Sequence, residues 1–182
     1  MNVAPFVGSP RDVVEKMLEI VEPKSGEILY DMGSGDGRVL IMAAKKFGIN
    51  CIGIELRDDL VSRTKEEIKR LNLERKIQIT NDDFFKIDIS DADVVFLYLT
   101  TLANEKLRPK LEKELKGGVR VISHDYEIRG WIPTKVFKDE PDGHIIYFYI
   151  FDPLKTPKPL ETSKPKIRDI FSYYPIDPIN PI

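Results

Sequence analysis

The residues best suited to chemistry lie just after a hydrophobic run, where an acid precedes glycines at every second position. The segment from position 31 to 38 reads D-M-G-S-G-D-G-R. Glycines at a strand-to-helix turn permit a tight bend and a close ligand approach, because no Cβ blocks either. The helix expected after them presents free backbone N–H groups to negative charge. This segment therefore predicts a ligand-binding turn.

The spacing of the glycines distinguishes this turn from a dinucleotide-binding loop. A dinucleotide fingerprint reads G-x-G-x-x-G, whereas here the third glycine, Gly37, comes one residue early and Arg38 holds the usual position. The carboxylate of Asp31, two residues before the first glycine, suits a ligand that carries an amino group better than one that carries a pyrophosphate. The turn therefore favours an amino-bearing ligand.

The pattern D-x-G-x-G-x-G resembles the first motif of the seven-strand S-adenosylmethionine (SAM) methyltransferases. In that family the acid and the glycines hold the methionine end of the cofactor. The resemblance implies that role for Asp31, Gly33, Ser34, Gly35 and Gly37. The alternative is a purely structural glycine turn, and the motif favours the cofactor.

Two later strand ends carry groups that suit the rest of SAM. Glu55 ends the second expected strand, about 20 residues after the glycines, where an acid accepts hydrogen bonds from ribose hydroxyls. Leu56 is expected to cover one face of the adenine. After the third strand, the family resemblance implies adenine binding by Asp83 and Phe84, with Asp82 as the alternative acid. The structural alternatives are a solvated strand-end acid and a polar turn before a core phenylalanine.

The end of the fourth expected strand limits the type of acceptor. This strand, residues 93–100, is almost entirely apolar, as in a strand buried on both faces. Its end, Tyr98-Leu99-Thr100-Thr101, is expected to face the transferred methyl group, with a core aromatic role as an equal alternative for Tyr98. It lacks the Asn/Asp-Pro-Pro-aromatic motif of enzymes that methylate amino nitrogens of bases. Base-carbon methylation needs a cysteine near the fourth or fifth strand, and the single cysteine, Cys51, is in the second.

Alternating strands and helices must position these groups. Helices are expected at 13–21, with Ser9 as N-cap and Pro10 in the first turn, and at 38–47 and 60–71; a short one begins at Pro109. Strands are expected at 28–30, 51–54, 76–80, 93–100 and 119–123, followed by an antiparallel pair at 136–137 and 144–151. Together with the family resemblance, this order predicts an α/β protein with a Rossmann-like doubly wound seven-strand methyltransferase sheet, mostly parallel with an antiparallel C-terminal strand.

The composition is that of a globular domain. Of the 182 residues, 42% are hydrophobic, and no segment is typical of a signal peptide or a membrane span, so a cytoplasmic location is expected. One cysteine excludes a disulfide framework, and the scattered His124 and His144 lack metal-ligand spacing, so no metal is expected. A net charge of −2 argues against electrostatically driven nucleic-acid binding. Abundant Lys, Glu and Ile with a single glutamine suggest a thermophile.

Two blocks resemble a narrower family. Residues 102–111 (LANEKLRPKL) and 121–131 (VISHDYEIRGW) are similar to the small archaeal protein-lysine methyltransferases, which are related to mitochondrial lysine methyltransferases. The similarity runs from about Pro5 to Phe151, and the second block is its most specific part. It implies SAM-dependent methyl transfer to lysines of protein substrates, with S-adenosyl-L-homocysteine as the product.

Methyl transfer to lysine needs little machinery beyond positioning and a neutral amine. An apolar channel favours the neutral amine, and aromatic faces favour the cationic sulfonium. Tyr98, Leu99, Thr100 and Tyr126, with the N-terminal segment Phe6–Val7 above them, are expected to form this channel. Glu127 is expected to orient the amine, and the alternative is that Glu127 pairs with Arg129. No obligatory general base is expected.

The methyltransferase domain is expected to span residues 1–151, followed by an extended proline-rich tail at 152–182. The tail is expected to have no catalytic role, and a contact between chains is one use for it. Two other functions stay open, because fold does not determine substrate. One is an RNA or small-molecule methyltransferase on the same fold, and the other is a SAM-binding regulator without catalysis.

Overall fold

A single seven-stranded sheet forms the centre of the computed structural model, which describes residues 7–138 and 143–155. Its strand order is β3-β2-β1-β4-β5-β7-β6. The strands are β1 (Ile28–Met32), β2 (Asn50–Glu55), β3 (Ile77–Asn81), β4 (Val94–Leu97), β5 (Arg120–His124), β6 (Lys135–Lys138) and β7 (Ile145–Ile150). Strands β1 to β5 are parallel, while β7 is antiparallel to both β5 and β6. The expected α/β architecture with its antiparallel C-terminal strands is confirmed.

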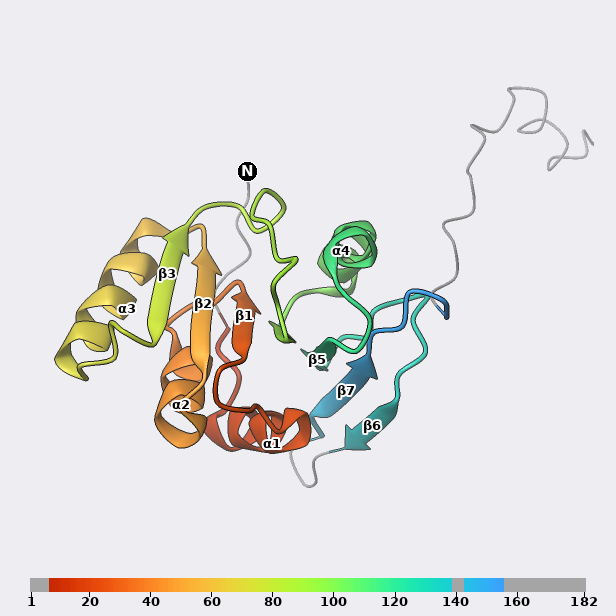
Figure 1. Ribbon diagram of the computed structural model, residues 1–182, viewed down its shortest axis with the longest axis horizontal. Helices are drawn as coiled ribbons and strands as arrows, with labels where there is room; N and C mark the ends of the chain where they lie inside the picture. The colour runs from red at the N-terminus through yellow and green to blue at the C-terminus, as the bar shows by residue number, and fades with distance from the viewer. Residues whose placement is uncertain (1–6, 139–142, 156–182) are drawn as a thin grey trace, which may run out of the picture.

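Helices cover both faces of the sheet. They are α1 (Arg11–Val21), α2 (Arg38–Phe47), α3 (Asp58–Arg70) and α4 (Thr101–Glu114). Helices α1, α2 and α3 lie on one face and α4 on the other (Figure 1). Strand β4 alternates between the two cores, with Val94 and Phe96 packed on the first and Val95 and Leu97 on the second. The strand is therefore buried on both faces, which explains its continuous apolar sequence.

Two expectations about helix starts were wrong. Pro10, not Ser9, occupies the N-cap position of α1, and the hydroxyl of Ser9 instead makes a hydrogen bond to a distant histidine. Helix α4 does not begin at Pro109 but contains it, and the Thr100 hydroxyl caps the helix by accepting from the Ala103 backbone N–H at 3.3 Å. A proline inside a helix removes one backbone hydrogen bond. Burial of Leu107 and Leu111 on either side of it stabilises the helix despite that loss.

The chain leaves the sheet earlier than expected after the fourth strand. Strand β4 ends at Leu97 rather than Thr100, and residues 98–100 lead over the edge of the sheet into α4. None of the described helices is long and apolar enough to cross a membrane. Of the proline-rich tail expected from residue 152, everything from residue 156 onward lies outside the described residues.

Candidate active site

A cavity of about 470 Å³ opens at the carboxyl ends of β1, β2, β3 and β4. This is the edge at which open α/β sheets bind ligands. Most residues expected at the site line it: Asp31, Gly33, Ser34, Glu55, Leu56, Asp82, Asp83, Phe84, Tyr98, Thr100 and Tyr126. Three expected residues, Gly35, Gly37 and Glu127, are not among the lining residues. The fold therefore brings groups from four strand ends into one space.

Asp31 is the buried acid of the cavity. It lies near the end of β1 with only 5% of its surface exposed, and no cation among the described residues pairs with it. Burial, reinforced by the negative charges of Glu55 and Asp36, raises the pKa of Asp31 to about 7. A carboxylate held in this way favours a cationic ligand group, because such a group supplies the missing charge partner.

The turn after β1 offers further ligand contacts. Ser34 is buried, and its hydroxyl has no hydrogen-bond partner among the described residues. An unpaired buried hydroxyl costs free energy, and a ligand in the cavity would satisfy it. Gly33 is exposed at the cavity with a φ of 94°, a conformation that a residue with a Cβ adopts only under strain. The turn thus combines an open backbone with an unsatisfied hydroxyl beside a buried carboxylate.

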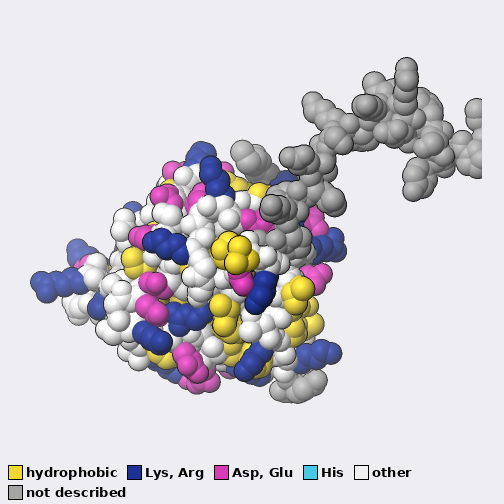
Figure 2. Space-filling view, turned by 45° about the vertical axis from the view of Figure 1, so that its right-hand side comes forward, with side chains coloured by type: hydrophobic (Ala, Val, Ile, Leu, Met, Phe, Trp, Pro, Cys, Tyr) yellow, Lys and Arg dark blue, Asp and Glu magenta, His cyan; other side chains and the backbone are white. Residues whose placement is uncertain are grey.

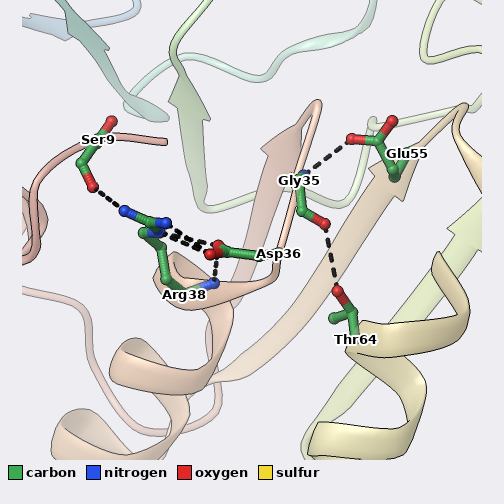
Figure 3. Close-up of polar contacts among 6 residues, drawn as sticks. All are labelled: Ser9, Gly35, Asp36, Arg38, Glu55 and Thr64. Atoms are coloured by element: carbon green, nitrogen blue, oxygen red, sulfur yellow. Dashed lines mark hydrogen bonds and ion pairs between the residues drawn. The ribbon is translucent and has the colours of Figure 1, made fainter. Parts of the chain in front are cut away.

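Glu55 stabilises the glycine turn from the neighbouring strand. Its Oε2 accepts the backbone N–H of Gly35 at 2.9 Å (Figure 3). On the other side of Gly35, the carbonyl oxygen accepts the hydroxyl of Thr64, from α3, at 3.2 Å. Gly35 is therefore held between β2 and α3 rather than exposed to the cavity. Its place in the motif is structural support for the turn.

Gly37 is the N-cap of α2, and its environment permits only glycine. Its φ is 72°, and a Cβ at this position would lie 2.4 Å from Thr64 Cγ2. The third glycine of the motif therefore allows α2 to begin close to α3.

An ion pair that sequence reasoning missed joins the turn to the N-terminal segment. The guanidinium of Arg38 contacts both carboxylate oxygens of Asp36, with Nη2 at 2.6 Å from Oδ2 (Figure 3). Its Nη1 donates to the backbone carbonyl of Ser9 at 2.7 Å. Burial raises the pKa of Asp36, but hydrogen bonding and charge from Arg38 outweigh it and leave this pKa below its usual value. The only signal in the sequence was an arginine where a dinucleotide fingerprint has glycine.

The segment after β3 is folded on itself at the far end of the cavity. Asp82 Oδ1 accepts the backbone N–H of Asp83 at 2.7 Å, and Asp83 Oδ1 accepts that of Phe85 at 3.0 Å. Phe84 is partly buried, and its ring centroid lies 4.7 Å from that of Phe85. Both acids and Phe84 line the cavity, so the geometry leaves both candidate acids available.

Aromatic rings form the opposite end of the cavity. The rings of Tyr98 and Tyr126 are stacked with centroids 6.3 Å apart, and Tyr98 also packs on His124 at 4.1 Å. Burial, aided by the nearby carboxylate of Asp125, raises the pKa of Tyr98. Its phenol therefore keeps its proton at neutral pH and cannot serve as a base. Thr100 lies at the same end, where its hydroxyl caps α4.

A buried asparagine, also missed by sequence reasoning, holds the loop that carries Tyr126. The Nδ2 of Asn104, inside α4, donates to the backbone carbonyls of Tyr126 at 3.1 Å and Glu127 at 3.3 Å. The Ser123 hydroxyl donates to the same Tyr126 carbonyl at 2.5 Å. Little in the sequence signalled this role, because the helix was expected to begin only at Pro109, after Asn104.

Glu127 is directed away from the cavity. Its side chain is 55% exposed, and its Oε1 lies 3.8 Å from Nε of Arg129. Arg129 in turn donates to Glu105 of α4 at 2.8 Å. This geometry matches the alternative of a Glu127–Arg129 pair. Cys51 is buried in β2, and burial raises the pKa of its thiol to about 12.

The two histidines, which are scattered in the sequence without metal-ligand spacing, meet in space. His124 Nε2 lies 3.0 Å from His144 Nδ1, and Asp125 contacts both rings. They meet because β5 and β7 pair in antiparallel register, which places residues 124 and 144–146 side by side. Burial lowers the pKa of His124 to about 4, so this ring is neutral at pH 7.

Comparison with known proteins agrees with the geometry. The profile of the ANTKMT methyltransferase domain matches residues 31–135. A protein-lysine N-methyltransferase of Saccharolobus islandicus is 45% identical over 150 residues, which cover 80% of this chain and 92% of that protein. The adenine nucleotide translocase lysine N-methyltransferase of Mus musculus is 30% identical over 139 residues, 76% of this chain; the chain spans about 60% of that relative's length.

A similar solved structure belongs to an enzyme that is named for a different substrate. The structure of an RNA methyltransferase from Salinibacter ruber, in complex with S-adenosyl-L-homocysteine, superimposes with a TM-score of 0.80. It is 37% identical in sequence, and the match covers 85% of this chain and 99% of that chain. The shared feature of these relatives is methyl transfer, whereas their described acceptors differ.

Proposed function

The chain belongs to the ANTKMT methyltransferase domain family, and we propose that its cavity transfers the methyl group of SAM to the side-chain amine of lysine in protein substrates. The observation that carries this proposal is one cavity with two stacked tyrosines at one end and, at the other, the buried carboxylate of Asp31, which pairs with no cation among the described residues. Such a cavity suits a cationic cofactor next to an amine acceptor. The protein is therefore a SAM-dependent enzyme.

The cofactor half of the cavity fits SAM. Asp31 would bind the ammonium group of the methionine end, and the unpaired Ser34 hydroxyl would bind its carboxylate beside the Gly33 backbone. Glu55 accepts three backbone N–H groups, and the remaining lone pair on its Oε2 is suited to a ribose hydroxyl. Gly35 and Gly37 act through the shape of the turn.

The adenine would lie at the end of the cavity formed by β2 and β3. Leu56 is half exposed at the cavity wall, where it would cover one face of the base. Phe84 would pack on the other side, and Asp83 or Asp82 would accept from the exocyclic amine. The binding energy for the base is thus spread over apolar contacts and one or two hydrogen bonds.

The acceptor half of the cavity solves a protonation problem. Bound SAM supplies an electrophilic methyl group on a sulfonium, and the lysine nitrogen must attack it with a free lone pair. Deprotonating a lysine of pKa about 10.4 at pH 7 costs roughly 4–5 kcal/mol. Tyr98 and Tyr126 exclude water and lower that cost by desolvation, while their faces favour the positive charges on either side of the reaction. The proton leaves to water, and Thr100 fixes the start of α4 beside the channel.

A second candidate function is RNA methylation, which the description of the Salinibacter ruber relative favours. The charges at the cavity oppose it. Five carboxylates line the cavity against two guanidinium groups, and both of these are paired, Arg38 with Asp36 and Arg57 with Asp59. On the face shown in Figure 2, Lys and Arg are interspersed with Asp and Glu among the described residues. Nucleic-acid binding depends on clustered positive charge, so lysine in protein is the better acceptor.

Methyl transfer from labelled SAM into a lysate of a thermophilic archaeon tests this function. Label that resists ribonuclease, is released by protease and appears in mass spectra as methyl-lysine would support it. Label that ribonuclease removes would establish RNA as the acceptor instead. Asp31→Asn serves as the matched inactive control, because it keeps the shape of the cavity but removes the charge.

Two properties rest on the sequence alone. The abundance of Lys, Glu and Ile supports an origin in a thermophile, and the sequence features given above favour a cytoplasmic location. We propose that residues 1–151 form the catalytic domain, with the proline-rich segment from 152 as an extension outside the catalytic machinery. Gel filtration with and without that extension would test whether it joins chains together.

A further inference from the structure

Three metal-ligating side chains converge beside β5, outside the residues that line the cavity. His124 ends β5, Asp125 follows it, and His144 immediately precedes β7. His124 Nε2 lies 3.0 Å from His144 Nδ1 and 3.3 Å from Asp125 Oδ2. The third side of the triangle, from His144 Nδ1 to Asp125 Oδ2, is 3.2 Å. One potential metal-ligand atom from each residue therefore lies at a nearly equal distance from the other two.

The size of this triangle matches the ligand spacing of a small cation. A tetrahedral Zn²⁺ with bonds of about 2.0–2.1 Å separates its ligand atoms by roughly 3.3 Å. A single proton on one of the two facing ring nitrogens gives an ordinary hydrogen bond between the imidazoles at 3.0 Å. When both facing nitrogens are unprotonated, their lone pairs and those of the carboxylate converge, and a divalent cation is a partner that accepts all three.

The surroundings orient the three groups for this purpose. The Ser9 hydroxyl lies 2.8 Å from His124 Nδ1 and can accept its proton, which leaves the lone pair of Nε2 facing the cluster. The Ile145 backbone N–H donates to Asp125 Oδ1 at 3.0 Å, and the Tyr98 ring packs on the His124 ring. Metal-binding histidines are oriented by an oxygen partner on the second ring nitrogen in the same way.

We propose that His124, Asp125 and His144 form a binding site for one divalent transition-metal ion of the Zn²⁺ type. His124 binds through Nε2, His144 through Nδ1 and Asp125 through one carboxylate oxygen. Two imidazoles and a carboxylate suit Zn²⁺ and Co²⁺, whereas Mg²⁺ and Ca²⁺ prefer oxygen ligands only. The ion joins β5 to β7. It also supports Ser9 and Tyr98, which both line the cavity. This site does not depend on which acceptor the enzyme uses.

Metal binding is tested on the full chain, freed of any affinity tag and stripped with a chelator. Equilibrium dialysis against Zn²⁺ should give one ion per chain, and Co²⁺ should give the intense visible absorption of a tetrahedral complex that Zn²⁺ then abolishes. The thermal midpoint should rise by roughly 5–10 °C at a Zn²⁺ concentration one hundredfold above Kd. The chain contains only two histidines, so any imidazole-bound metal must involve this cluster.

Two variants make the test specific. His144→Ala removes a ligand that is partly exposed, and Asp125→Asn removes the charged ligand while keeping its shape. Both should lose Zn²⁺ and the Co²⁺ absorption, while Asp88→Asn, an exposed acid outside the cluster, should keep them. Circular dichroism establishes that each variant is folded. Absence of stoichiometric Zn²⁺ or Co²⁺ binding by the parent, or unchanged binding by folded His144→Ala, would overturn the site in favour of a proton-only network.

Discussion

Glu55 and Gly35, 20 residues apart in the chain, are joined by a hydrogen bond in which the Gly35 backbone N–H donates to Glu55 Oε2 at 2.9 Å. The other oxygen, Oε1, accepts the backbone N–H groups of Leu56 and Arg57, each at 2.9 Å. The acid at the end of β2 thus fixes the glycine turn that follows β1. The proposed binding of the cofactor ribose and the shape of the turn depend on the same side chain.

Replacing Glu55 by glutamine should weaken both the fold and cofactor binding. The amide keeps one accepting oxygen, so a buried backbone N–H loses its acceptor, at a cost of about 1–3 kcal/mol in the free energy of unfolding. Urea denaturation and calorimetric titration with S-adenosyl-L-homocysteine measure the two effects. Glu127→Gln, an exposed acid outside the cavity, should change neither. A Glu55→Gln variant that is as stable as the parent would contradict the role of Glu55 as acceptor of these backbone N–H groups.

In the cofactor-free protein, ionised Asp31 should lower the free energy of unfolding, and this effect should grow as the pH rises. Its pKa is about 7 in the folded state and about 3.9 in an unfolded chain, so between these values the folded state binds more protons. Stability is therefore lost as the pH rises from about 4 to 7. Asp31→Asn escapes this loss and should exceed the parent by roughly 2–4 kcal/mol at pH 8, with little difference at pH 4. Urea denaturation across this range should show the gap widening; a gap that narrows with pH would refute the assignment.

The same carboxylate should make cofactor affinity depend on pH. Only ionised Asp31 pairs with the ammonium group of S-adenosyl-L-homocysteine, so affinity should fall by about tenfold for each pH unit below 7. Asp31→Asn should bind weakly at every pH, without that slope. Calorimetric titration from pH 5 to 8 checks both proteins. A parallel slope in the two proteins would assign the dependence to another group.

Of the two glycines that cap α2, Gly37 and Gly48, Gly37 should tolerate replacement by alanine less well. Gly37→Ala places a Cβ 2.4 Å from Thr64 Cγ2, in addition to the strain of a φ of 72°. Gly48→Ala is a matched control, since its φ is 65° and nothing lies within 4 Å of the new Cβ. The control should lose about 1–2 kcal/mol of unfolding free energy, and Gly37→Ala a further 1–3 kcal/mol, approximately. Adding Thr64→Ser, which removes only the methyl group, should recover the free energy of unfolding that Gly37→Ala loses beyond the control. Urea denaturation measures this recovery.

Asn104 should affect turnover without affecting cofactor binding. Asn104→Ala removes the donor to the carbonyls of Tyr126 and Glu127 and leaves only the Ser123 hydroxyl on the first, so the loop that carries Tyr126 loses its anchor on α4. The methyl-transfer rate at saturating SAM should fall by about tenfold to a hundredfold, because the acceptor channel loses its alignment. Affinity for S-adenosyl-L-homocysteine should stay within error of the parent. Lys106→Ala, an exposed change on the same helix, should leave both quantities unchanged.

The sequence alone was enough to predict the sheet and several residues from its strand ends that line the cavity. Alternating apolar runs and glycine turns are local signals, and helix α2 was predicted with its observed bounds, Arg38–Phe47. In a parallel sheet all carboxyl ends meet at one edge. Once the strands were located, Asp31, Glu55 and Asp83 had to lie near one another, although 52 residues separate the first from the last.

Only the tertiary structure decided the rest of the site. Ser9 bonds to His124 across 115 residues, and Asn104 holds a loop that begins about 20 residues later. The two histidines meet because of antiparallel pairing between β5 and β7. Such contacts depend on the register of strands and on which face of a helix is buried, and no local pattern encodes the partner of a polar side chain. Sequence motifs therefore predicted residues that line the cavity on the side proposed for the cofactor, whereas packing determined the aromatic end of the cavity and the histidine cluster.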